Sequence, residues 1–176
     1  MLRVQGLALP RSEPFGVDLH GIQLDVRAGE VVGIAGVSGN GQKELLYALS
    51  GEDTRAAPEM VQIAGREAGR LGPGRRRALG LHFVPEERLG RGAVPSMGLA
   101  HNLLLTRKTA LGAGGWIRMG QLQEQARAII ARFNVKAGGP NAAAKSLSGG
   151  NLQKFIVGRE IDARPKLLII LSLIHI

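Results

Sequence analysis

The chain has 176 residues, 44% of them hydrophobic, which is enough to bury the core of one ordinary globular domain. It contains no cysteine, and this excludes disulfides and cysteine-based zinc sites. The net charge of +9 would suit a nucleic-acid surface, but aromatic residues make up only 3% and arginine far outnumbers lysine, so we attribute the charge to coding bias and expect no nucleic-acid partner.

The N-terminal part has the patterns of β-strands. Residues 2–9 are spaced as a short strand, and residues 22–26 alternate between apolar and polar side chains, as in a half-buried strand. We expect these two to form an antiparallel β segment. Residues 30–35 (EVVGIA) are more continuously apolar, which predicts a third strand in a buried position.

A glycine-rich loop at residues 36–41 follows this predicted strand. A helical pattern then covers residues 42–49, and Gly51 ends it. Residues 52–80 are polar and rich in arginine around a short predicted strand at 61–63.

The second half alternates between strands and helices. We expect a strand at residues 81–85, mainly helical structure over 97–146 with its clearest helix at 121–133, a helix at 148–161 and a buried strand at 167–170. This order predicts an α/β fold with an inserted helical subdomain.

Residues 36–43 (GVSGNGQK) lie between a predicted strand and a helix, where a phosphate-binding loop belongs. Glycines let consecutive N–H groups surround an anion, and the helix N-terminus adds partial positive charge. The alternative is a tight turn without a ligand. The candidate nucleotide-binding residues of the loop are Gly36, Ser38, Gly39, Asn40, Gly41, Gln42 and Lys43.

The loop departs from the usual pattern at two positions. Gln42 stands where a phosphate-loop lysine is expected, and Lys43 stands where a serine or threonine would bind Mg²⁺. Lys43 cannot take over the lysine's role, because one step along a helix turns the side chain by about 100°. We therefore predict that the loop holds a nucleotide but hydrolyses it slowly.

Residues 147–151 (LSGGN) are the most specific feature of the chain. Ser148 is a good helix N-cap, but a cap alone does not account for the glycine-rich loop upstream and the apolar strand downstream. With both, the chain resembles the ABC ATPase cassette, a P-loop NTPase domain with a RecA-like core. The resemblance implies that a signature segment consisting of Leu147, Ser148, Gly149, Gly150 and Asn151 acts in trans, on the γ-phosphate of ATP bound by a partner cassette.

A narrower resemblance rests on residues 34–45 (IAGVSGNGQKEL), 83–94 (FVPEERLGRGAV) and 148–154 (SGGNLQK). Together they resemble the second, C-terminal cassette of two-cassette ATPases that import sugars and nucleosides, and Gln42 is typical of that cassette. The segment PEERLGRGAVP favours the nucleoside importers. The resemblance covers residues 2–170.

It implies ATP and Mg²⁺ as cofactors, a partner cassette and membrane permease subunits as partners, and a cytoplasmic location, peripheral on the inner face of the cell membrane. A helical subdomain at about 96–146 would dock on the permease. Glu86 stands where the family usually has glutamine before its helical subdomain; a solvated loop is the alternative there. For Phe15, stacking on adenine and a place in the core are equally open.

The resemblance also implies an acidic residue directly after the strand at 167–170, but no acidic residue follows Asp162. We therefore assign no catalytic residue and no certain metal ligand. Residues 171–176 match the translation of an adaptor used in sequencing libraries, so we interpret them as a non-native tail on a C-terminally incomplete ABC ATPase domain, residues 1–170. The alternatives are a soluble ABC-type ATPase that acts on nucleic acid and an inactive fragment.

Overall fold

The computed structural model describes residues 1–37, 39–107 and 117–171, and its backbone divides into two units, Met1–His82 and Phe83–Ile176. The first unit is built on a four-stranded antiparallel sheet with the strand order β2-β1-β3-β4. Its elements in chain order are β1 (Leu2–Leu9), β2 (Leu19–Val26), α1 (Gln42–Ser50), the 3-10 helix η1 (Pro58–Met60), β3 (Val61–Ile63), β4 (Arg66–Glu67) and α2 (Pro73–Ala78).

The pairing of β1 with β2 confirms the predicted antiparallel β segment. Strand β1 buries Leu2, Val4, Leu7 and Leu9. Buried residues are two apart at each end of the strand but three apart between Val4 and Leu7. The register shifts at that point, where Gly6 has a φ of 60°. A bulge with a left-handed glycine adds one residue and so returns the side chains after it to the core face.

The predicted buried strand at residues 30–35 is wrong. Residues 31–37 belong to no helix or strand and are exposed, with Val31 96% and Val37 76% accessible. An apolar run becomes a buried strand only when neighbouring strands take its backbone hydrogen bonds and other elements cover its faces. Among the described residues no strand pairs with this segment, so its composition alone does not bury it.

Helix α1 confirms the predicted helix after the glycine-rich loop, and Gly51 ends it with a left-handed φ of 88°. Its last carbonyls are held by Arg76, a fully buried residue of α2, a helix that the sequence analysis did not predict. The Arg76 guanidinium donates to the carbonyl oxygens of Ala48, Leu49 (2.8 Å), Leu71 (2.7 Å) and Gly69 (2.9 Å). Burial lowers the pKa of Arg76 to about 10, and Asp53 offsets part of that effect.

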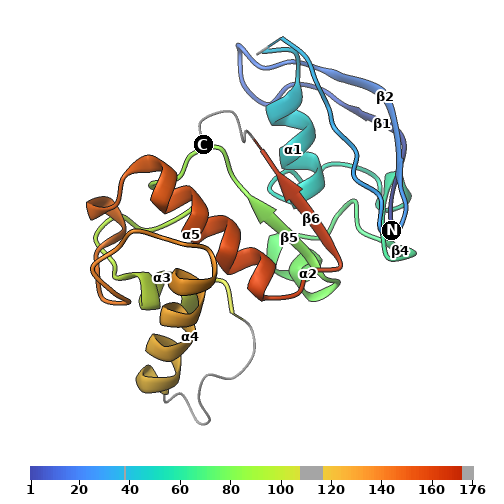
Figure 1. Ribbon diagram of the computed structural model, residues 1–176. Helices are drawn as coiled ribbons and strands as arrows, with labels where there is room; N and C mark the ends of the chain where they lie inside the picture. Colours follow the sequence, from blue (N-terminus) through green and yellow to red (C-terminus); the bar gives the residue numbers. More distant parts are fainter. Residues whose placement is uncertain (38, 108–116, 172–176) are drawn as a thin grey trace. The chain divides into compact units, whose positions relative to one another are not determined.

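The second unit contains most of the remaining elements. They are β5 (Leu81–Val84, whose first two residues belong to the first unit), α3 (Leu99–Leu104), α4 (Met119–Arg132), the 3-10 helix η2 (Ala144–Ser146), α5 (Gly149–Asp162) and β6 (Leu167–Ile170). Strands β5 and β6 pair, and their arrows run the same way in Figure 1. Leu171 extends this pairing, because its N–H donates to the Val84 carbonyl at 3.0 Å.

The core of the second unit lies among its three α-helices. Helix α4 buries Leu122, Ala126 and Ile129, the helical spacing expected for an amphipathic helix. The largest apolar side chains of this core are Leu99, Leu103, Leu122, Ile129, Leu152, Phe155 and Ile156. The range 96–146 of the predicted helical subdomain contains α3, α4 and η2, while residues 108–116 lie outside the described residues. Its role as a separate subdomain stays a prediction.

In the described part of the chain, no helix is both long and apolar enough to cross a membrane. Residues 172–176 lie outside the described residues, so the proposed non-native tail is untested there.

Candidate functional site

The glycine-rich loop closes on the side chain of Gln42, the first residue of α1. The Gln42 amide accepts a hydrogen bond from the Asn40 N–H at 3.1 Å and donates one to the Val37 carbonyl at 2.9 Å. A Cβ on Gly36 would come within 2.7 Å of the Gln42 Nε2 atom, so only glycine leaves room for this arrangement. One of the N–H groups that could bind a phosphate therefore already has an acceptor.

The other glycines of the loop set its backbone. Gly39 and Gly41 have φ values of 90° and 93°, in the left-handed region that favours glycine. Gly41 precedes α1, and a Cβ added there would lie 3.4 Å from side-chain atoms of Val17 and Leu19. Ser38, another candidate residue of the loop, lies outside the described residues.

The Lys43 side chain contacts residues outside the loop. Its ammonium group lies 4.0 Å from the Glu13 carboxylate and 5.5 Å from the centre of the Tyr47 ring. Tyr47, and then Glu13, raise the pKa of Lys43, so the side chain stays cationic at neutral pH. A cationic donor cannot replace the hydroxyl that would bind Mg²⁺.

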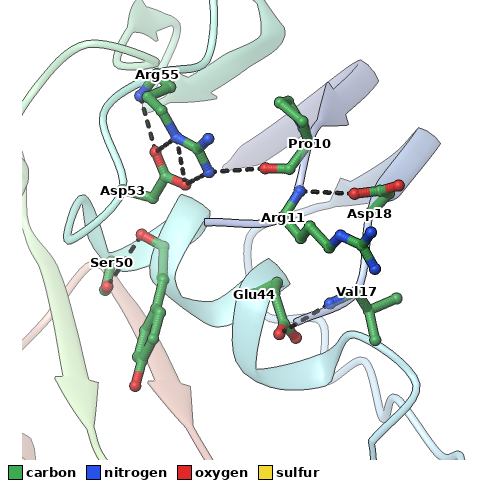
Figure 2. A network of polar contacts seen from close by, with 9 residues as sticks. Pro10, Arg11, Val17, Asp18, Glu44, Ser50, Asp53 and Arg55 are labelled. Carbon is green, nitrogen blue, oxygen red and sulfur yellow. Dashed lines mark hydrogen bonds and ion pairs between the residues drawn. The ribbon is translucent and has the colours of Figure 1, made fainter. Parts of the chain in front are cut away.

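Polar contacts link the start of α1, and the segment after this helix, to residues 10–18 (Figure 2). The Glu44 carboxylate accepts a hydrogen bond from the Val17 N–H at 3.3 Å, and Asp18 accepts one from the Arg11 N–H at 2.7 Å. Beyond the other end of α1, the Arg55 guanidinium donates to Asp53 and to the Pro10 carbonyl at 2.9 Å. The Glu44 bond ties α1 itself to residues 10–18, and the other bonds join residues 10–18 with one another and with the segment after the helix.

Two further sequence predictions concern single residues. The Phe15 side chain is fully exposed, so its alternative role in the core is wrong, and stacking on adenine stays a prediction. Glu86 is also exposed and belongs to the second unit, while the glycine-rich loop belongs to the first. Its role at a nucleotide likewise stays a prediction.

The signature segment forms the start of α5. Leu147 packs against the core of the second unit, and Ser148 takes the N-cap position with an extended backbone. The Ser148 hydroxyl makes no capping bond to the helix backbone and instead accepts a hydrogen bond from the Asn151 side-chain amide at 2.8 Å. Gly149 and Gly150 form the first turn, where backbone N–H groups have no acceptor within the helix.

Asn151 links this helix start to the loop after α4. Its Oδ1 atom accepts a hydrogen bond from the Lys136 backbone N–H at 2.8 Å. A backbone N–H can only donate, so this contact fixes the amide oxygen, and the Asn151 amide hydrogens must face Ser148. The Ser148 oxygen is therefore used as an acceptor, and its own hydrogen is left to donate elsewhere.

A second polar link at the signature segment was not predictable from the sequence. Arg88 comes from the loop after β5, and its Nε atom donates to the Oε1 atom of Gln153 at 2.8 Å. A Cβ on Gly149 would collide with the Nη1 atom of Arg88, so the guanidinium lies directly against the first residue of α5. The two partners are 65 residues apart, and no local pattern marks them.

The loop that carries Arg88 is fixed on α5 at two further points. Gly92 packs so closely that a Cβ there would approach the Ile156 side chain to 2.8 Å. The buried Arg159 donates to the Gly92 carbonyl at 2.9 Å and to the Asn102 carbonyl at 3.2 Å. The backbone conformation of residues 87–93 is thus coupled to the helix that begins with the signature segment.

The described residues contain no preformed cluster of metal ligands. No group of three histidine, cysteine, aspartate or glutamate side chains converges there in a way that could hold a metal ion. Lys43 occupies the position of the usual hydroxyl ligand, and its ammonium group cannot coordinate a cation. The loop therefore lacks the usual hydroxyl ligand, and the expected Mg²⁺ cofactor stays a prediction.

The chain is similar to known proteins of one family. The family model described as ABC transporter matches residues 19–170. A glucose import ATP-binding protein of Haloferax volcanii is 41% identical over 155 residues, which cover 86% of this chain and 28% of that protein. A nucleoside import ATP-binding protein of Lactococcus lactis is 35% identical over 172 residues, which cover 97% of this chain and 34% of that protein. The chain therefore spans about a third or less of the length of these curated relatives.

Among solved structures, the dimeric ATP-binding cassette MJ0796, in a post-hydrolysis state with ADP and Pi, is similar with a TM-score of 0.74 at 18% identity. The match covers 97% of this chain and 73% of that one. A nucleotide-free ATP-binding cassette of an ABC transporter matches with the same TM-score over 99% of this chain and 70% of that chain. At this level of identity the match establishes the fold.

Proposed function

The chain belongs to the ABC transporter family and has the α/β fold of its ATP-binding cassettes, and on this premise we propose that it is the ATPase cassette of an importer for a nucleoside or a simple sugar. The import of glucose and of nucleosides named for its relatives supports this substrate range. A membrane permease would be its partner, which would place the cassette at the cytoplasmic face of the membrane.

Within that role, the signature segment would complete the nucleotide site of a partner cassette. The observation that carries this proposal is the arrangement at the start of α5. The Ser148 hydroxyl oxygen accepts a hydrogen bond from the Asn151 amide, so the hydroxyl hydrogen of Ser148 remains available to a phosphate. The N–H groups of Gly149 and Gly150 add further donors and the positive end of the helix dipole. Such preorganised donors stabilise charge that develops on a transferring phosphate.

The cassette's own phosphate loop would bind nucleotide weakly and hydrolyse it slowly. A phosphate entering the loop has to displace the Gln42 amide from the Asn40 N–H. The loop lacks both the usual lysine and a hydroxyl for Mg²⁺, and losing one such group typically lowers a rate by roughly 100- to 1000-fold. These departures favour the second-cassette type, in which the partner cassette performs most of the hydrolysis.

ATP turnover with and without a partner cassette tests this function. We expect little turnover by the chain alone and rapid turnover when a cassette with an intact phosphate-loop lysine is added. Ser148→Arg should abolish the rapid turnover, because its side chain would occupy the position of the γ-phosphate. The matched control is Gln125→Arg, which adds the same cation on an exposed position of α4 and should leave turnover unchanged.

Two results would contradict the proposal. Fast turnover by the chain alone would show that the departures at Gln42 and Lys43 do not disable its loop. Unchanged turnover in Ser148→Arg would show that the signature segment does not act on the partner's nucleotide. The substrate class is tested separately, by whether nucleosides or simple sugars stimulate turnover when the cassettes are reconstituted with the permease.

A further inference from the structure

Arg88 occupies a position where a cation is electrostatically unfavourable. Its guanidinium lies against Gly149, the first residue of the 14-residue helix α5. The N-terminus of a helix carries a partial positive charge and favours anions. The first turn of α5 contains no acidic residue that could compensate for the added cation.

The position of Arg88 is nevertheless fixed by a buried partner. Gln153 is only 2% exposed, and its Oε1 atom accepts the hydrogen bond from the Arg88 Nε atom at 2.8 Å. The Gln153 Nε2 atom is buried without an acceptor. A buried amide with an unused donor is costly, and here it holds a cation at the end of a helix.

The outer edge of the guanidinium is left without an acceptor. Among the described residues, neither terminal nitrogen of Arg88 makes a hydrogen bond, and no ion pair joins Arg88 to the adjacent carboxylates of Glu86 and Glu87. Arginine presents its donors in a rigid fork that matches phosphate oxygens. The Arg88 cation, the N-terminus of α5 and the Ser148 hydroxyl hydrogen all present positive charge at this point. An anion bound there would balance it.

We propose that Arg88 is a further phosphate-binding residue of the signature segment, which contacts the γ-phosphate of the ATP held by the partner cassette. This inference rests on the proposed action of the signature segment in trans. Gln153 acts as a positioning residue, because it orients the guanidinium through Nε and leaves the two terminal nitrogens for the phosphate. Gly149 allows the close approach, since any side chain there would displace Arg88.

The test compares variants in the complete ATPase assembled with a partner cassette that has an intact phosphate-loop lysine. Loss of a hydrogen bond to a charged group should lower kcat/KM for ATP about 10- to 100-fold in Arg88→Gln. Arg88→Lys keeps the charge and should recover much of this loss. Arg127→Gln removes the same charge from an exposed position of α4 and should have no effect.

A second readout separates binding from folding. Both Arg88→Gln and Arg88→Lys lose the bond to the buried Gln153 and should unfold at a similarly lowered temperature. If Arg88 acts on phosphate, only Arg88→Lys should recover turnover, because it keeps the cation. If the Gln and Lys variants lose turnover equally and both unfold at lower temperature, Arg88 only supports the loop, and the inference is wrong.

The outcomes also distinguish this inference from the proposed function. If Ser148→Arg abolishes the partner's turnover but Arg88→Gln retains it fully, the trans-acting signature stands and Arg88 takes no part. If Ser148→Arg itself has no effect, the proposed function fails, and the role of Arg88 fails with it.

Discussion

Helix α5 packs against the end of α4 at Gly158, and Gly158→Ala tests how tightly the two helices pack. A Cβ on Gly158 would lie 2.6 Å and 2.7 Å from two ring atoms of Phe133. Carbon atoms pack best at about 3.5 to 4.0 Å, so the ring would have to withdraw by about 1 Å. Phe133 packs against the core of the second unit, which limits that movement.

Two effects of opposite sign decide the result. Alanine in place of glycine stabilises a helix by about 1 kcal/mol, while adding a methyl group to a packed core costs about 1–3 kcal/mol. Because the contact is with an aromatic ring that packs against the core, we expect the packing cost to exceed the helix gain and Gly158→Ala to lower the free energy of unfolding by about 1 kcal/mol or more.

Urea unfolding followed by circular dichroism measures this difference. Gly120→Ala is the matched control, because Gly120 lies in α4 with no atom within 4 Å of an added Cβ, and it should stabilise the protein by about 0.5 kcal/mol. Phe133→Leu in the Gly158→Ala background should recover part of the loss. If Gly158→Ala is as stabilising as Gly120→Ala, the reasoning from close packing is refuted.

Three further predictions concern buried or ion-paired polar groups. Arg76→Met should lower the free energy of unfolding by about 3 kcal/mol in chemical denaturation, because it leaves buried carbonyl groups at the end of α1 without donors. Asn102→Ala should cost about 2 kcal/mol in the same assay, since the Asn102 side chain bonds both the N–H and the carbonyl of Val94; a change below 0.5 kcal/mol (about the size expected of a surface substitution) would count against this. The hydrogen bonds from Arg55 lower the pKa of the Asp53 carboxyl below 3.8, so its contribution to stability is present above that pH and is lost as the pH falls through the lower native value. Asp53→Asn should therefore weaken the pH dependence of stability below pH 3.8, and an unchanged acid limb would contradict the assignment.

The sequence by itself determined the elements whose cause is local. Strand β1, helix α1 with its ending at Gly51, and helix α5 with Ser148 at its N-cap follow from periodicity, glycine conformation and capping preference, which act within a few residues. The positions of the glycine-rich loop and the signature segment were predictable for the same reason. What the signature serine contacts was not, because Asn151 also bonds Lys136, which the chain brings near only through the packing of α4 on α5.

Only the tertiary structure decided which side chains meet across long stretches of sequence. Arg76 reads as one member of an exposed arginine run, yet it is fully buried, because the carbonyls at the end of α1 need donors and the loop before α2 brings the guanidinium to them. Arg88 and Gln153 pair over 65 residues in the same way. The apolar residues 31–37 show the converse: their composition suits a buried strand, but burial requires pairing and cover from other segments, and no local pattern can supply either.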